Sequence, residues 1–153
     1  MKILIVDDSA FMRTILKDLI PSSKWAGATI LEAENGDDAV TISQAEQPDL
    51  ILLDVVMPGK DGIEVLKEIG GGMPSVVIVS SMGQENVIDQ AKTLGAKDYI
   101  VKPFDARMVV DSLNKLYPET EGAPAADANA TPTAPPSDTP AEQPANTTQN
   151  PSV

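Results

Sequence analysis

The chain has 153 residues and a formal net charge of −12, from 23 acidic and 11 basic side chains. This acidity argues against nucleic-acid binding, which depends on basic surfaces. Cysteine and histidine are both absent, which excludes disulfides, thiolate or imidazole metal ligands, and catalysis by either side chain.

The first predicted strand is the apolar run Ile3–Val6, which two aspartates follow directly. A run of this length is too short for a secretory signal or a membrane span, so we expect a cytoplasmic protein. Ser9 is predicted to cap the first helix, which Pro21 ends. The apolar face of this helix is predicted to hold Phe11, Ile15, Leu16 and Leu19.

The middle of the chain repeats the pattern of strand and helix. Ala28–Ala33 is the second predicted strand, and Asp37 is expected to cap the helix after it. The apolar positions of that helix are Val40, Ile42 and Ala45. Leu50–Leu53 is the third strand, and its wholly apolar sequence is typical of a strand buried on both faces. A loop over residues 57–62 leads to a helix that ends at a run of glycines and has Ile63, Leu66 and Ile69 inward.

Two more strands and two more helices complete the predicted pattern. Val76–Val79 is the fourth strand, and a helix from Glu85 to Leu94 follows, with Gly95 as its C-cap. Its inward residues are Val87, Ile88, Ala91 and Leu94. Lys97–Val101 is the fifth strand, and Asp105 opens the last helix. The inward residues of this helix are Met108, Val109, Leu113 and Leu116.

Strands that alternate with helices imply parallel pairing with helices on both faces of the sheet. We therefore expect an α/β fold with a doubly wound sheet, formed by one domain over residues 1–117. Composition changes at Pro118, because residues 118–153 hold eight of the 13 prolines and no lysine or arginine. Such a segment buries too little apolar surface to offset the entropy of ordering it. It is predicted to be a disordered, acidic tail rich in Pro, Ala and Thr.

Carboxylates follow two of the predicted strands. Asp7 and Asp8 come after the first strand, and Asp54 comes after the third. Open α/β sheets bind their ligands at the carboxyl ends of the strands, so we expect these three groups to converge. A divalent cation would balance their repulsion, and Mg²⁺ is the candidate because carboxylates, water and phosphate complete its shell. Lys102 follows the fifth strand and adds one ammonium group at the same edge.

This set of residues is suited to phosphoryl transfer onto a carboxylate. Asp54 is the candidate acceptor, because it directly follows an apolar strand as a single acid and precedes a loop. Asp8, with Asp7 behind it, would hold Mg²⁺, and Lys102 would contact the phosphoryl oxygens. Ser80 ends the fourth strand and could donate a hydrogen bond to them. Each residue alone is typical of a cap, a loop or a solvated surface, but five together at one edge are hard to explain that way.

Residues 1–117 resemble the receiver domains of the response-regulator family, and especially the CheY-like chemotaxis regulators. The matching motifs occur in the right order across the whole predicted domain. They are Asp7-Asp8, Asp54 with Met57-Pro58 and Asp61-Gly62, Ser80, Tyr99, and Lys102-Pro103-Phe104. The resemblance implies a flavodoxin-like (βα)5 sandwich with strand order 2-1-3-4-5.

The resemblance also implies how such a protein works in two-component signalling. Asp54 would take a phosphoryl group from the histidine of a CheA-like kinase or from acetyl phosphate. The backbone carbonyl of Val56 would join Asp7, Asp8 and Asp54 in the Mg²⁺ site, and the bond after Lys102 would be cis. Ser80 would then move toward the phosphoryl group, and Tyr99 would rotate into the vacated space.

The resemblance implies further that the face of the last two helices and the fifth strand changes its affinity for an output protein, such as a FliM-like flagellar motor switch. A phosphatase is an additional expected partner, whereas nucleic acid and membrane are not. The protein is expected to be a monomer. It would not be an enzyme beyond its own phosphorylation and dephosphorylation.

Two apolar residues flank the expected phosphorylation site. Val56 and Met82 lie two positions after the acceptor and after Ser80, where receivers place the side chains beside the attacking water. Neither can orient water by a hydrogen bond, which predicts slow self-dephosphorylation. The alternative is that both residues only pack the rim of the loop.

Other functions remain open from the sequence. Within the family, the chain could be a phosphorelay intermediate that passes its phosphoryl group to another histidine protein, or the receiver of a chemotaxis methylesterase. An Mg²⁺-dependent phosphatase of the haloacid-dehalogenase type would need a second acid two residues after its nucleophile, and position 9 is serine. A flavodoxin-type carrier would have Asp7 and Asp8 repelling its FMN phosphate. The runs Phe11-Met12-Arg13 and Ser80–Gly83 favour the chemotaxis regulators by resemblance.

Overall fold

The computed structural model describes residues 1–20, 25–70 and 74–118. Five parallel strands form one sheet in the order β2-β1-β3-β4-β5, which confirms the expected topology. The strands are β1 Lys2–Val6, β2 Thr29–Ala33, β3 Leu50–Leu53, β4 Ser75–Ser80 and β5 Asp98–Val101. The helices are α1 Ala10–Leu19, α2 Gly36–Glu46, α3 Gly62–Ile69, α4 Glu85–Thr93 and α5 Ala106–Leu116.

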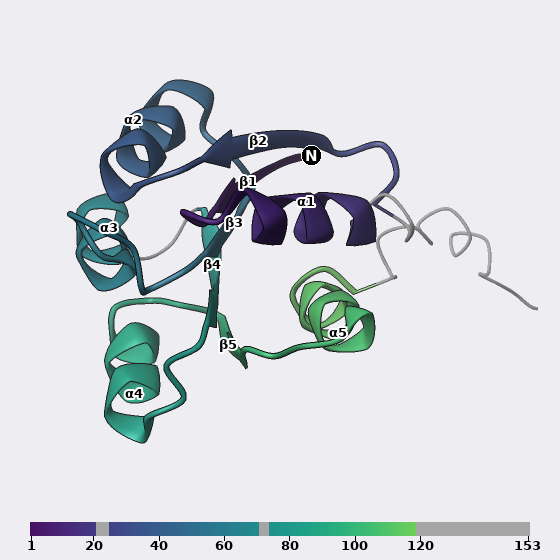
Figure 1. The fold of residues 1–153 in the computed structure, drawn as a ribbon. Coiled ribbons are helices and arrows are strands. Elements are labelled where there is room, and N and C mark those ends of the chain that lie inside the picture. The colour runs from purple at the N-terminus through teal and green to yellow at the C-terminus, as the bar shows by residue number, and fades with distance from the viewer. Residues whose placement is uncertain (21–24, 71–73, 119–153) are drawn as a thin grey trace, which may run out of the picture. The chain divides into compact units, whose positions relative to one another are not determined.

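The helices form two layers with the sheet between them. Helices α1 and α5 cover one face, and α2, α3 and α4 cover the other (Figure 1). Every residue of β3 is buried, as its apolar sequence predicts, whereas the edge strand β2 is mostly half-buried or exposed. Burying one large aliphatic side chain stabilises a fold by about 1.5–3 kcal/mol. The central strands are therefore the most firmly held part of the fold.

The chain divides into two units, Met1–Leu116 and Tyr117–Val153. The tail predicted from residue 118 lies outside the described residues, except for Pro118 itself, so the domain limits stay a prediction. Among the described residues, no helix has the length and apolar character needed to cross a bilayer.

Three caps at the helix ends can be compared with the sequence predictions. Ser9 caps α1 and accepts a hydrogen bond from the N–H of Met12, as predicted. The prediction that Asp37 caps α2 was wrong, because the helix begins earlier and Asn35 accepts from the N–H of Asp38 at 2.8 Å. The C-cap of α4 is Leu94, and Gly95 is the next residue, at φ 111°. Two hydrogen bonds close this end in a Schellman motif, Gly95 N to Lys92 O and Ala96 N to Ala91 O.

Some residues predicted to face inward are exposed. Phe11 is 71% exposed, because the buried side of α1 runs through Arg13, Leu16 and Ile20, and Phe11 lies about 140° around the helix from Leu16. Met108 on α5 is 43% exposed. Ala45 on α2 is also exposed, since the buried stripe of that helix is Gly36, Ala39, Val40 and Ser43.

Candidate functional site

The register of the two central strands brings the predicted acids together. Val6 of β1 pairs with Leu53 of β3, and the N–H of Asp54 donates to the Val6 carbonyl at 2.9 Å. Carboxylate oxygens of Asp7, Asp8 and Asp54 all lie within 4.8 Å of one another. Asp7 and Asp54 are buried, whereas Asp8 is exposed. The three acids form a pocket whose inner wall is buried and whose outer side meets solvent.

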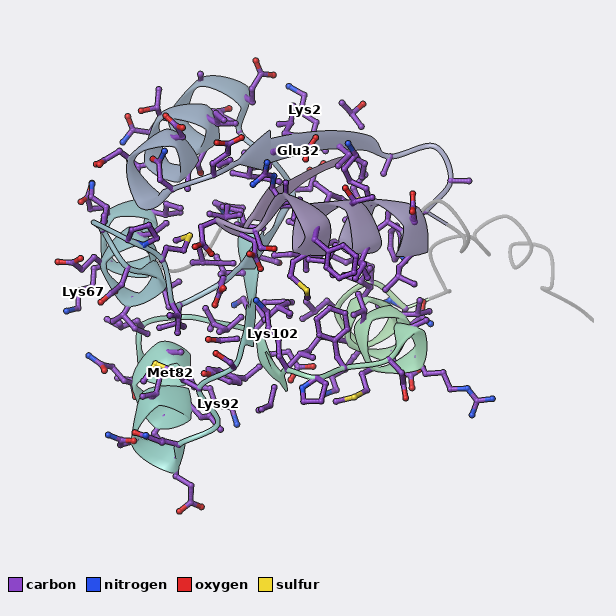
Figure 2. All side chains as sticks on the ribbon, viewed as in Figure 1. Lys2, Glu32, Lys67, Met82, Lys92 and Lys102 are labelled. Atoms are coloured by element: carbon purple, nitrogen blue, oxygen red, sulfur yellow. The ribbon has the colours of Figure 1, made fainter. Side chains whose placement is uncertain are left out.

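Lys102 is the cation of this pocket. Its Nζ lies 2.7 Å from Asp7 Oδ2 and 3.0 Å from Asp54 Oδ2, and its side chain is 18% exposed. The backbone N–H of Lys102 donates to the Ser80 carbonyl at 2.8 Å, and the Lys102–Pro103 bond is cis, as expected. Figure 2 shows Lys102 beside the end of β5. Burial opposes the charged ammonium, but hydrogen bonds with Asp7 and Asp54 outweigh it and raise the pKa of Lys102 above its ordinary value.

The loop after β3 is packed tightly against Asp54. The N–H of Val56 donates to Asp54 Oδ1 at 3.0 Å, and the N–H of Gly62 donates to the Val55 carbonyl at 3.0 Å. A Cβ atom at position 62 would lie 2.2 Å from the Asp54 carbonyl oxygen. Asp61 starts α3 with a capping box, in which its side chain accepts from Glu64 N and the Glu64 side chain accepts from Asp61 N. The Asp61-Gly62 motif thus allows the backbone at the start of α3 to touch the backbone of Asp54, directly after β3.

Ser80 and Tyr99 are connected through the backbone of Met82. Ser80 is fully buried at the end of β4, and its Oγ accepts from the N–H of Met82 at 3.4 Å. The Tyr99 hydroxyl donates to the carbonyl of the same Met82. Burial raises the pKa of Tyr99, so the hydroxyl keeps its proton for this bond. The sequence motifs point to Ser80 and Tyr99, but the link between them through the backbone of Met82 is visible only in the structure.

The two apolar residues of the loops differ in their surroundings. Val56 is 48% exposed. Met82 is half-buried, packs against the hydrophobic core, and lies beside α4 in Figure 2. The proposed roles of both residues beside an attacking water stay predictions.

Arg13 is also part of the site, although the sequence did not predict it there. This α1 residue is buried, and its Nη1 donates to the Asp7 carbonyl at 2.8 Å. Its other donors reach Glu32 at 3.2 Å and Glu34 at 3.0 Å. The sequence feature that could have indicated this role is an arginine on the buried side of the first helix, together with two acids, Glu32 in β2 and Glu34 directly after it.

A doubly wound five-stranded parallel sheet in the order 2-1-3-4-5, with three acids and a lysine at its carboxyl edge, defines a flavodoxin-like α/β protein. The chain belongs to the response-regulator family, because the model of the response regulator receiver domain matches residues 3–114. This membership excludes the flavodoxin-type carrier and the haloacid-dehalogenase-type phosphatase.

Individual relatives agree with the family match. The chain is 44% identical over 117 residues to the chemotaxis protein CheY of Listeria monocytogenes, covering 75% of this chain and 97% of that protein. It is 38% identical over 119 residues to the sporulation initiation phosphotransferase F of Bacillus subtilis, covering 76% and 94%. A solved CheX–CheY–BeF3–Mg²⁺ complex from Borrelia burgdorferi superposes with a TM-score of 0.68 at 31% identity, covering 76% of this chain and 88% of that one.

The family match establishes the general role of the domain. Receiver domains are signalling modules that histidine kinases phosphorylate, rather than enzymes acting on a separate substrate. The cluster of Asp7, Asp8 and Asp54 is typical of the magnesium site in such domains.

The close contact between Gly62 and the Asp54 backbone gives a prediction. Gly62→Ala would place its methyl group against the Asp54 backbone, so we expect the free energy of unfolding to fall by about 1–3 kcal/mol. Urea denaturation of both proteins measures the change. Gly27→Ala is the matched control, since a Cβ there meets nothing within 4 Å, and its effect should stay within about 0.5 kcal/mol. Equal unfolding midpoints for the two variants would contradict the close packing described here.

Proposed function

We propose that this chain is a phospho-accepting response regulator, in which Asp54 receives a phosphoryl group from a partner histidine kinase with Mg²⁺ in the acid pocket. The observation that carries the proposal is the single ammonium group of Lys102, in contact with the Asp7 and Asp54 carboxylates beside the exposed Asp8. This arrangement leaves a negatively charged pocket open on its solvent side, with a fixed positive charge next to the acceptor.

The residues present fit Mg²⁺. All three candidate side-chain ligands, Asp7, Asp8 and Asp54, are carboxylates, which this ion prefers, and the backbone carbonyl of Val56 would complete the protein's share of the shell. The solved relative that is a complex with BeF3 and Mg²⁺ supports the same ion here. Bound Mg²⁺ would neutralise charge on the phosphoryl oxygens.

The transfer step requires a nucleophile and a positive charge at the acceptor. A carboxylate oxygen of Asp54 would attack phosphorus, while the bond from phosphorus to the donor imidazole nitrogen, or to the acetate oxygen of acetyl phosphate, breaks. Lys102 would form an ion pair with the oxygens of the transferred phosphoryl group, since its raised pKa keeps it an ammonium.

Ser80 would couple phosphorylation of Asp54 to a change in conformation outside the site. If Ser80 turns toward a phosphoryl oxygen, its Oγ leaves the Met82 N–H, and the carbonyl of that residue holds the Tyr99 hydroxyl. Phosphorylation would therefore shift Met82 and Tyr99 together, and with them the surface of α4, β5 and α5.

The acceptor is tested by intact-mass measurement after incubation with acetyl phosphate, with and without Mg²⁺. The parent should gain one phosphoryl group only with Mg²⁺, and Asp54→Asn should gain none, because the amide is a poor nucleophile. Asp89→Asn, an exposed acid of α4, is the control and should behave as the parent. An adduct on Asp54→Asn, or none on the parent, would overturn the proposal.

The apolar side chain of Val56 predicts a long-lived phosphorylated state. Val56→Asn would add a group that can orient water, so we expect dephosphorylation to accelerate by about tenfold. Loss of the phosphoryl group over time, followed by mass, measures the rate. Val56→Ala lacks such a group and should stay near the parent rate. If the asparagine variant also keeps the parent rate, Val56 only packs the rim of the loop.

Within the family, a single-domain chemotaxis regulator that acts on the flagellar motor switch is the function we infer. Its support is the higher identity to CheY than to the sporulation phosphotransferase. Phosphorylated protein should bind a FliM-like motor switch protein more tightly than Asp54→Asn does, as fluorescence anisotropy would measure. Rapid transfer of the phosphoryl group to a histidine phosphotransfer protein, without motor binding, would instead favour the phosphorelay intermediate.

A further inference from the structure

Arg13 is a charged residue beside the acid pocket that the proposed mechanism does not use. It lies on α1 with only 7% of its surface exposed, although an arginine side chain is rarely buried unless it is paired. Three of its nitrogen atoms make hydrogen bonds to three different residues. A side chain held at this many points has one orientation and can act as a rigid support.

Two acids, one in β2 and one directly after it, hold the Arg13 guanidinium in place. Glu32 accepts from Nε at 3.2 Å, and Glu34 accepts from Nη2 at 3.0 Å. Lys17 binds the second oxygen of Glu32 at 2.8 Å. The hydrogen bond from Lys17 lowers the pKa of Glu32, and burial opposes it while Arg13 adds to it, so this acid stays ionised.

The remaining donor of Arg13 acts on the site itself. Nη1 donates to the Asp7 carbonyl oxygen at 2.8 Å, in a buried position. That carbonyl belongs to the peptide group between Asp7 and Asp8, and a peptide group is planar. Fixing the carbonyl oxygen therefore fixes the plane from which Asp8 leaves the strand.

Asp7 is held at each of its other polar atoms as well. Its N–H donates to the Ala33 carbonyl at 3.2 Å, Oδ1 accepts from Ser9 N at 2.8 Å, and Oδ2 accepts from Lys102. Asp8, by contrast, is exposed, and no hydrogen bond of its carboxylate is found among the described residues. The direction of Asp8 thus depends on the backbone before it, and Arg13 is the side chain that orients that backbone.

We propose that Arg13 is a positioning residue for the metal site, because it fixes the Asp7–Asp8 peptide group so that both carboxylates face the cation together. This inference rests on the proposed function, since it assumes that the acid pocket binds Mg²⁺. Among the described residues, Arg13 makes no hydrogen bond or ion pair with the carboxylates of Asp7, Asp8 or Asp54. Its loss should therefore weaken metal binding and leave phosphoryl transfer itself intact once the metal is saturating.

The test is Mg²⁺ titration by isothermal calorimetry on the full chain, for the parent, Arg13→Met, Arg13→Lys and Lys17→Met. Arg13→Met keeps an apolar stem but no donor, and should bind Mg²⁺ about 10- to 100-fold more weakly, as is typical when the partner of a metal ligand is removed. Arg13→Lys keeps a single donor nitrogen in place of three and should lie between this variant and the parent. Lys17→Met removes the other hydrogen bond to Glu32, has no effect on the bond to the Asp7 carbonyl, and should bind Mg²⁺ as the parent does.

The rate of phosphorylation by acetyl phosphate supplies a second measurement. At saturating Mg²⁺, Arg13→Met should reach the parent rate, whereas at low Mg²⁺ it should be slower by the same factor as its affinity. Thermal unfolding without metal identifies variants that are merely unfolded. If Arg13→Met does not fold, Arg13→Lys decides, and parent-like Mg²⁺ affinity in that variant would overturn the inference.

The outcomes separate this inference from the proposed function. A folded Arg13→Met with parent affinity overturns the role of Arg13 alone, as does an equal loss in Lys17→Met. A parent chain that binds no Mg²⁺ and gains no phosphoryl group overturns the proposed function, and this inference with it.

Discussion

The ammonium group of Lys102 lies between the carboxylates of Asp7 and Asp54, and the arrangement of the site depends on this contact. Two buried carboxylates on adjacent strands would repel each other, and leaving such charges unpaired costs several kcal/mol. One cation shared by both resolves the repulsion without covering Asp8. The same contact ties β5 to β1 and β3, because Lys102 directly follows the fifth strand. One interaction therefore both balances the charge of the buried acids and joins the ends of three strands.

This contact requires the backbone at Asp7 and at Asp54 to be held in a fixed position. The register of β1 with β3 brings Asp54 beside Val6, and the lack of a side chain at Gly62 lets α3 close against the Asp54 carbonyl. On the other side, Arg13 holds the Asp7 carbonyl. The backbones of Asp54 and Asp7 are therefore each in contact with a residue of a neighbouring helix. The backbone at Asp7 and Asp54 is thus fixed in advance, which is the preorganisation that a charged site requires.

Hydrogen bonds through Met82 connect the end of β4 to the loop before α4 and to β5. Ser80 and Tyr99 both bond to the backbone of Met82, one to its N–H and the other to its carbonyl. A backbone segment with a hydrogen-bond partner on each side can lose one partner while its side chain stays packed. Met82 packs against the core and lies beside α4, so a change of its partners would reach the surface of that helix.

Local sequence determined most of the architecture, because short apolar runs, glycines and capping residues act over a few positions. The alternation of strand and helix predicted the α/β class, and acids or lysine at strand ends predicted Asp7, Asp8, Asp54 and Lys102 as one cluster. Periodicity was less reliable at helix ends: Phe11 and Ala45 fit an apolar pattern but lie outside the stripe that faces the sheet.

Tertiary structure alone decided which partners these residues meet. The burial of Arg13, the link through Met82 and the contact of Gly62 with Asp54 join segments that are distant in the chain or depend on backbone atoms, which no side-chain pattern reports. The sequence by itself thus determined which chemical groups meet at the edge of the sheet. Only the packing of the helices decided how they are held, because orientation depends on contacts between elements rather than on the order of residues within them.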